Sequence, residues 1–232
     1  MDTLFSPIRC YADFCAALLS AGFSMGGTND EGVFALCSPD RCADTVAWHT
    51  GDPETDPWEW RMRVLEERDD IAYAKVFFCK SGYIVRAWAP YFLAARRNGA
   101  PLSEAYAAGA VGRLEKRLYE LVEQHGVLPL HALKALSGCG RADKARFDRA
   151  LTTLQMRMDL SICGRQRKTD ALGQAYGWSS TMFCTAERFW GEAVLDQART
   201  LDPAAAMEAI AAQARRLNPA VDARRLHRWI AG

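Results

Sequence analysis

Apolar residues recur with helical spacing in several parts of the first hundred residues. The spacing predicts a helix over residues 8–21, ended by Gly22, and another over residues 90–97, closed by Asn98 and Gly99. A further helix is expected to begin at Pro57. Asp56 is a good N-cap there, proline suits the first helical position, and Glu59 completes a capping box.

Two continuous apolar runs in the same region are typical of buried strands. Residues 33–37 follow a glycine-rich loop over residues 26–32, and residues 71–78 are rich in aromatic and β-branched side chains. A turn over residues 80–82 would let residues 83–86 return as the partner of the second run. We therefore expect a mixed region of helices and a hairpin in the first half of the chain.

From residue 113 onward the spacing of apolar residues predicts the helices more clearly. A helix is expected over residues 113–125, with an apolar stripe that ends at Gly126. A short extended link over residues 127–128 leads to Pro129 and to a short helix over residues 130–136. A third helix follows, with Asp143 as its N-cap.

The third helix has two distinct faces. Its apolar residues, which fall at steps of four, three and four, are Phe147, Leu151, Leu154 and Met158. This narrow stripe is expected to pack on the two preceding helices. The opposite face carries Ala145, Arg149, Thr152 and Met156, with Arg146, Thr153 and Arg157 alongside. Such side chains reach base edges and phosphates when a helix lies in the major groove.

A hairpin is expected after this helix. Residues 160–163 alternate as a strand, and residues 176–184 can pair with them across a loop over residues 164–173. Arg165, Arg167 and Lys168 would stand near the tip of the hairpin. The order helix, short strand, helix, helix, strand, basic loop, strand is that of a winged helix-turn-helix.

The expected fold class is therefore α+β, in three parts. An N-terminal mixed helix and hairpin domain would span residues 1–110, and the winged helix-turn-helix would span residues 111–190. A C-terminal helical tail, rich in alanine and arginine, would span residues 191–232.

Composition adds a local charge asymmetry. Half of the 232 residues are hydrophobic and a quarter are charged, as in ordinary globular proteins, and 29 basic against 28 acidic residues leave a net charge of +1. Residues 51–70 hold eight acidic residues and three arginines, a local charge of −5. Residues 141–168 hold eight cations and three acids, a local charge of +5. A polyanion would be held by the second segment and repelled by the first.

These features favour a protein that binds double-stranded DNA, for example a transcriptional regulator. The residues expected to contact DNA are Arg146, Arg149, Thr153, Arg157, Arg165, Arg167 and Lys168. Those of the helix would lie in the major groove, and those of the hairpin would hold the backbone or the minor groove. Pairing of two chains would suit paired half-sites.

Other classes of site have weaker support in the sequence. The eight cysteines lack a C-x-x-C pair, and only Cys37 and Cys42, with His49 downstream, are spaced at all like metal ligands. Core thiols in a reducing cytoplasm are the favoured interpretation, with no metal and no cofactor. No P-loop, G-x-G-x-x-G, H-E-x-x-H or G-x-S-x-G string occurs, so no catalytic residue is assigned. We expect no membrane span and no secretory signal, because apolar runs are short and Asp2 stands where a basic region would.

Three phrases of the chain carry a family resemblance: GDPETDPWEWR, IAYAKVFFCKSGYI and LGQAYGWSSTMFCTAERFW. The chain resembles, over most of its length, a bacterial family described as related to the AlkZ-type winged-helix DNA glycosylases. Those enzymes have tandem winged helices and a catalytic Q-x-Q or Q-x-D motif. The nearest string here is Gln155-Met156-Arg157, which ends in arginine. No catalytic residue is therefore carried over to this chain.

Two alternatives to simple DNA binding remain open. An AlkZ-like glycosylase acting on damaged bases would need a carboxylate or glutamine beside aromatic walls, and Asp52, Glu54 and Trp58 are the candidates. A winged helix can also serve as a protein-interaction module with no DNA role. Release of free base would identify the first, and binding that a polyanion does not affect would identify the second.

Overall fold

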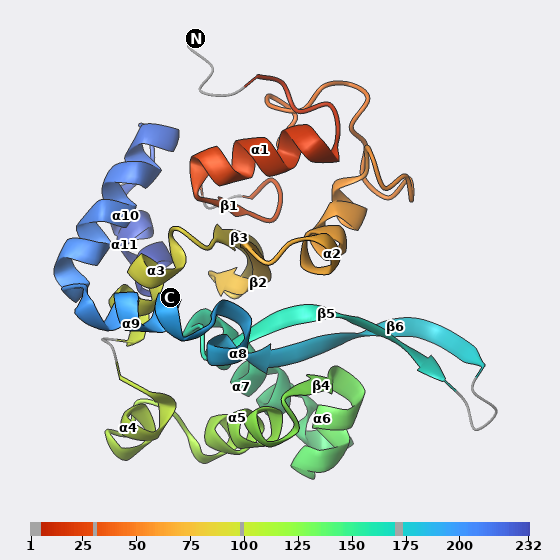
Figure 1. Cartoon of the computed structure of the whole chain (residues 1–232), viewed down its shortest axis with the longest axis vertical. Helices are drawn as coiled ribbons and strands as arrows, with labels where there is room; N and C mark the ends of the chain where they lie inside the picture. Colours follow the sequence, from red (N-terminus) through yellow and green to blue (C-terminus); the bar gives the residue numbers. More distant parts are fainter. Residues whose placement is uncertain (1–5, 30–31, 98–99, 170–173) are drawn as a thin grey trace.

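The computed structural model shows an α+β protein and describes residues 6–29, 32–97, 100–169 and 174–232 (Figure 1). Within these ranges the chain forms α-helices α1 to α11, one 3-10 helix and two small antiparallel sheets. The α+β class predicted from the sequence is confirmed. No helix in the described ranges combines the length and the apolar character needed to cross a bilayer.

The first sheet lies in the N-terminal half. Helix α1 (Tyr11–Ala21) leads into β1 (Phe23–Met25), and α2 (Pro57–Glu67) leads into the hairpin of β2 (Ile71–Phe77) and β3 (Lys80–Val85). The strand order is β1-β3-β2. Both strands of the hairpin are buried along most of their length. Their apolar composition therefore reflects burial on two faces.

Three local predictions in this half are corrected by the structure. The first helix begins at Tyr11, after Ile8 has formed an isolated bridge with Cys42. The turn of the hairpin lies at Phe78 and Cys79, both with positive φ, and Lys80 already belongs to β3. Residues 33–37 are buried but form only a bridge from Ala35 to Met25, because an apolar run signals burial and not strand pairing.

The second sheet lies in the C-terminal half. Helix α5 (Arg113–His125) leads into β4 (Val127–Pro129), α6 (Leu130–Ser137), the 3-10 helix η1 (Arg141–Asp143) and α7 (Lys144–Met156). A long hairpin of β5 (Leu160–Thr169) and β6 (Ala175–Thr185) follows, then α8 (Ala186–Trp190). The strand order is β4-β6-β5.

The hairpin strands are longer than predicted. Arg165 pairs with Thr181 and Lys168 with Tyr176, so the three basic residues lie in β5 and not in a loop. The pairing continues beyond two shifts of register, one between Ile162 and Gly164 and one between Gln166 and Lys168. Residues 170–173 of the predicted loop lie outside the described residues.

The C-terminal helices gather around α3 beside the first sheet. Helix α3 (Ala89–Arg97) contacts α9 (Glu192–Thr200), α10 (Pro203–Leu217) and α11 (Ala223–Ala231), while α4 (Leu102–Ala107) contacts α5. Trp229 of α11 stacks on Phe77 of β2 at 4.2 Å between ring centroids and lies 5.0 Å from Phe23 of β1. The C-terminal helices therefore pack back on the N-terminal sheet (Figure 1).

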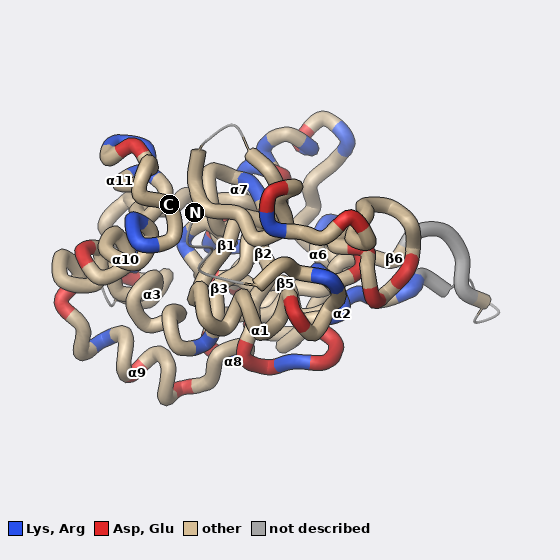
Figure 2. The backbone as a smooth tube through the Cα atoms, turned by 90° about the horizontal axis from the view of Figure 1, so that it is seen from above, with Lys and Arg blue, Asp and Glu red and all other residues tan. Residues whose placement is uncertain are grey.

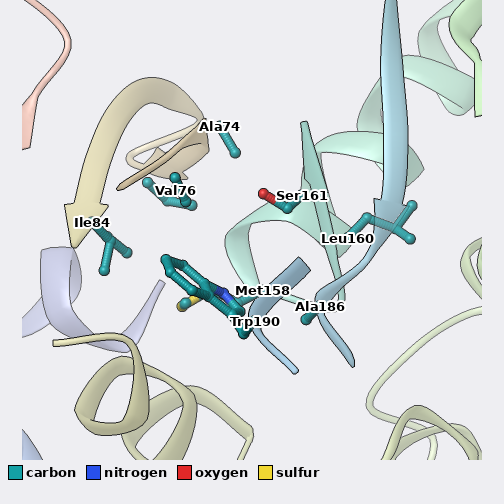
Figure 3. Close-up of a pocket in the computed structure, with 9 residues that line it drawn as sticks. Ala74, Val76, Ile84, Met158, Leu160, Ser161, Ala186 and Trp190 are labelled. Carbon is teal, nitrogen blue, oxygen red and sulfur yellow. The ribbon is translucent and has the colours of Figure 1, made fainter. Parts of the chain in front are cut away.

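Buried residues of all three predicted parts join one hydrophobic core. The division at residues 110 and 190 stays a prediction. Where the two halves meet, a closed cavity of about 10 Å³ remains. Figure 3 shows Trp190 and Met158 between the first sheet, with Val76 and Ile84, and the start of β5 at Leu160. A space of this size holds at most one water molecule, so it is a packing defect and not a ligand site.

Candidate nucleic-acid interface

The first half of α7 is exposed on the side predicted to face DNA. Phe147 and Leu151 are buried at 1% and 6% exposure, while Arg146 and Arg149 are exposed. The amphipathic pattern places the two arginines away from the apolar stripe, as the sequence indicated. Arg146 forms an ion pair with Asp143 at 3.0 Å, whereas Arg149 has no ion partner in the described part of the chain.

The last turn of α7 is covered by the N-terminal half. Gln155 accepts a hydrogen bond from the backbone N–H of Lys75 on β2, at 3.1 Å, and donates to the carbonyl of Leu151. The sulfur of Met156 accepts from the backbone N–H of Cys79 at 3.2 Å. The prediction that Met156 belongs to an open, DNA-facing surface is therefore wrong, because the tip of the β2–β3 hairpin packs there.

Arg157 is held by a buried carboxylate at the end of the same helix. Its Nε lies 2.8 Å from Asp159, which is fully buried and also lies 3.5 Å from the Nε of Arg97. Burial raises the pKa of Asp159, although both arginines act in the opposite direction. Arg157 thus neutralises part of a buried charge, and only 18% of its side chain is exposed.

Arg165 is committed to acidic residues of α2. Its Nε lies 2.8 Å from Glu66, and its Nη1 lies 3.7 Å from Glu59. The acidic segment over residues 51–70 and the basic hairpin therefore meet at the surface of the fold. Arg167 lies two residues farther along β5, is exposed, and has no ion partner among the residues that the structure describes.

Internal partners reduce the basic surface that the sequence predicted. Of the seven cations between residues 141 and 167, all of which have described side chains, four take part in ion pairs: Lys144, Arg146, Arg157 and Arg165. Figure 2 shows blue and red segments interspersed along the backbone in this view. Exposed ion pairs are weak. Lys144 and Arg146, whose side chains are each 69% exposed, can therefore exchange their partners for phosphates more readily than Arg157 and Arg165, which are 18% and 40% exposed.

A cavity of about 600 Å³ lies beside the exposed face of α7. We call it the interface cavity, and its polar lining includes Arg96, Asp148, Arg149, Thr152, Thr153 and Arg157. Three of the predicted DNA-contacting residues, Arg149, Thr153 and Arg157, are thus brought together at one place. The structure places the hairpin residues Arg165 and Arg167 elsewhere, on β5. The side chain of Lys168 lies outside the described residues.

Arg96 is the residue of this cavity that sequence reasoning missed. It is 9% exposed and donates to the carbonyls of Met156, Trp229 and Ile230 at 2.8, 3.0 and 2.9 Å. Burial lowers its pKa, but a guanidinium stays cationic at neutral pH. No local pattern distinguishes this arginine from its neighbour Arg97, since its role depends on backbone carbonyls far away in the sequence.

The other candidates from the sequence are not brought into one site. Asp52 accepts from the N–H of Glu54 and the hydroxyl of Thr55, and Glu54 pairs with Arg63 at 2.7 Å. Both carboxylates thus stabilise the loop before α2. Trp58 lines a pocket between the start of α2 and the first sheet, and neither carboxylate is among the described lining residues of that pocket.

The cysteine and histidine candidates for a metal site also separate. A hydrogen bond between the Cys37 and Cys42 thiols raises the pKa of Cys37, which burial raises further, and lowers the pKa of Cys42. His49 packs on Trp58 instead, with 4.7 Å between ring centroids. Within the described ranges, no three His, Cys, Asp or Glu side chains are placed to hold a metal ion.

Comparison with known proteins places the whole chain in one family. No curated protein and no solved structure matches it. A family model described as AlkZ related matches residues 8–231, which is nearly the entire sequence. The resemblance seen in the sequence is thus confirmed, and the chain belongs to the AlkZ-related family.

Proposed function

We propose that the protein binds duplex DNA, with residues 113–190 acting as a winged helix. In this proposal α7 lies in the major groove and the β5–β6 hairpin contacts the phosphate backbone. The observation that carries it is the exposed first half of α7, where Arg149 stands without an ion partner in the described structure, at the rim of the interface cavity.

The order of elements supports this proposal. Helix α5, the short strand β4, helices α6 and α7 and the β5–β6 hairpin follow one another as they do in a winged helix. The strand order β4-β6-β5 places the short strand beside the second strand of the hairpin. The N-terminal half has α1, β1, α2, β2 and β3, with one helix fewer between its first strand and its hairpin, and its sheet has the matching order β1-β3-β2.

The ion pairs of the fold limit the expected salt dependence. Arg141, Arg149 and Arg167 are the exposed arginines of this region for which the described residues provide no ion partner. Three phosphate contacts correspond to a slope of about −3 in a plot of log K against log salt concentration. The protein is thus expected to bind DNA weakly when no specific base contacts are made.

A fluorescence titration of a labelled duplex at several salt concentrations tests the proposal. The double substitution Arg149→Ala with Arg167→Ala should reduce the slope by about two units on any duplex. Arg199→Ala is the matched control, because Arg199 is an exposed arginine on α9 that pairs with Glu192 and Asp196. An unchanged slope in the double variant would reject the interface.

The family relationship favours a second candidate, a DNA glycosylase that acts on damaged bases. The interface cavity is large enough for a base, and Asp148 is the carboxylate among its described lining residues. A glycosylase would release free base from an alkylated duplex, and Asp148→Asn should reduce that release. If no base is released from several alkylated duplexes, the glycosylase candidate is rejected and DNA binding remains as the proposed function.

A protein-interaction module is the third candidate, and the same titration separates it from the other two. Excess polyanion should displace labelled duplex from a DNA-binding protein, whereas binding of a protein partner would persist. Pairing of two chains on paired half-sites remains part of the DNA-binding proposal, and sedimentation with and without duplex tests it.

A further inference from the structure

A second cavity, of about 230 Å³, lies between the start of α2 and the first sheet. We call it the aromatic pocket, and its lining includes Gly26, Gly27, Trp48, Trp58, Arg61 and Tyr83. Trp48 and Trp58 are each 41% exposed. Two large aromatic side chains that stay exposed contribute less to the hydrophobic core than buried ones would. Their presence together at one cavity is typical of a binding site.

A buried carboxylate holds the two tryptophans in place. Asp56 is fully buried and accepts hydrogen bonds from the backbone N–H groups of His49, Gly51 and Trp58 at 3.0, 2.9 and 2.8 Å. Trp48 precedes the first of these donors and Trp58 is the last. His49 adopts a φ of 64°, which is uncommon for a residue other than glycine. The loop and the helix start are thus fixed relative to each other before any ligand binds.

Two glycines let the backbone form one wall of the pocket. A side chain at Gly26 would come within 2.8 Å of the carbonyl of Ser81, and one at Gly27 within 3.3 Å of the Trp48 ring. Trp48 therefore lies directly against the chain at residue 27. Thr28 and Ser81 add hydroxyl groups to the lining, which can donate or accept hydrogen bonds.

The size and stacking surfaces of the pocket suit one flat ring system. Its volume is below the roughly 300–1,000 Å³ of sites for drug-sized ligands. The guanidinium of Arg61 stacks on Trp58 at 3.4 Å from the ring centroid. Heteroaromatic bases stack both on aromatic rings and on arginine planes. Trp48 and the Arg61–Trp58 pair thus offer two platforms of the kind that bases use.

The charge of the lining selects against cations. Arg61 and Lys80 line the pocket, and no Asp or Glu stands among its described lining residues. An aromatic site that receives cations leaves ring faces free, whereas Arg61 already covers Trp58. A positively charged ring would therefore meet the like charge of the Arg61 guanidinium, with no carboxylate among the described lining residues to offset it.

From these contacts we propose that the aromatic pocket binds one neutral heteroaromatic ring of purine size. The ring would stack on Trp48 and on the Arg61–Trp58 pair, and its edge would meet Thr28 and Ser81. The same chemistry is offered by a free base or nucleoside and by an unstacked base of a single strand. The inference does not depend on the proposed duplex interface, which lies on α7 and β5.

Titration calorimetry of the full chain with adenine, in the absence of nucleic acid, tests the pocket. Saturable binding is expected, and Trp48→Ala should weaken it about tenfold or more. Tyr106→Ala is the matched control, since Tyr106 is an exposed aromatic residue on α4 and should leave the affinity unchanged. Equal loss in both variants, or no binding to the wild-type chain, would overturn the proposal.

Two further arms sharpen the test. Neutral nicotinamide should bind better than the similarly shaped cation 1-methylnicotinamide, and the reverse preference would contradict the charge argument. Adenine-containing single strands that compete with adenine indicate a base presented by a strand, and strands that do not compete indicate a free ligand.

A measurement on the wild-type chain covers the case of a variant that does not fold. Adenine should shift the indole N–H resonances of Trp48 and Trp58, and leave those of the buried Trp60 and Trp229 in place. Shifts confined to buried tryptophans would overturn the assignment. Because no DNA is present, failure here leaves the duplex titration unaffected, and failure of duplex binding leaves this result standing.

Discussion

The two sheets of the protein have the same strand order but meet their surroundings differently. The first hairpin, β2–β3, is short, largely buried, and docked by its tip on the last turn of α7. The second hairpin, β5–β6, is buried near its base, whereas Arg165, Gln166 and Arg167 are exposed farther along. Side-chain character explains the contrast, since apolar strands remove surface from water and a basic strand stays hydrated.

The helices that precede the two hairpins differ in the same way. Helix α2 carries Glu59 and Glu66 toward Arg165, and its start forms the aromatic pocket. Helix α7 carries Arg146 and Arg149 on its exposed side. The two sheets thus share a strand order, but the start of α2 lines a small pocket, whereas α7 carries arginines on its exposed side.

The packing of α3 on the ends of α7 and α11 should depend most on Arg96. Arg96→Met would leave the carbonyls of Met156, Trp229 and Ile230 without their donor, and we expect a loss of about 3 kcal/mol in the free energy of unfolding. Urea denaturation measures it. The exposed Arg141→Met should change stability by less than about 0.5 kcal/mol. Equal effects would mean that Arg96 does not hold the halves together.

The aspartates that precede α2 and α7 should differ in how much they stabilise the protein, because only Asp56 accepts a hydrogen bond from the first turn of its helix. Asp56 is buried and accepts three backbone N–H groups, so Asp56→Ala should cost about 2 kcal/mol or more. Asp143 is partly exposed and accepts from Gly140 while it pairs with Arg146, so Asp143→Ala should cost about 0.5–1 kcal/mol. Denaturant midpoints of the two variants test this order, and a larger loss for Asp143→Ala would reverse the comparison.

Asp56 should also make stability depend on pH. Burial alone would raise its pKa, but hydrogen bonds from the N–H groups of Gly51, Trp58 and His49 outweigh this and lower the pKa below its usual 3.8. The folded state then binds this proton less readily than the unfolded state. The stabilisation is therefore complete above about pH 4 and is lost as the pH falls through the native pKa.

The amide variant isolates this effect. Asp56→Asn cannot ionise, so its unfolding free energy should fall less steeply with acid than that of the wild type. Urea titrations between about pH 2 and pH 6 compare the two slopes. Parallel curves would show that the Asp56 carboxylate contributes nothing to acid sensitivity.

The smallest expected difference is between two arginines of β5, in how much each contributes to the salt dependence of duplex binding. Arg167→Ala should reduce the salt dependence of duplex binding by about 0.9 of a unit, because this exposed side chain is available to a phosphate. Arg165→Ala should leave the slope nearly unchanged, since Arg165 is held by Glu66 and Glu59. Equal changes in slope would show that Arg165 leaves its carboxylates when DNA binds.

Local pattern was enough to predict much of the fold. The stripe of Phe147, Leu151 and Leu154 correctly predicted the buried face of α7, and Asp56-Pro57 correctly predicted the start of α2. Glycine after residue 125 correctly predicted the end of α5. These features depend on residues three or four positions apart, whose relative direction follows from helix geometry alone.

Contacts between segments that are far apart in the sequence could not be predicted from local pattern. Nothing near Arg165 indicates that Glu66, ninety-nine positions away, will bind it, or that Met156 will lie under the turn at Cys79. The aromatic pocket likewise collects residues from β1, α2 and β3 and from the loop that carries Trp48. Periodicity gives the direction of each side chain from its own helix or strand. The surface that it meets there depends on how the whole chain excludes water and satisfies its buried polar groups.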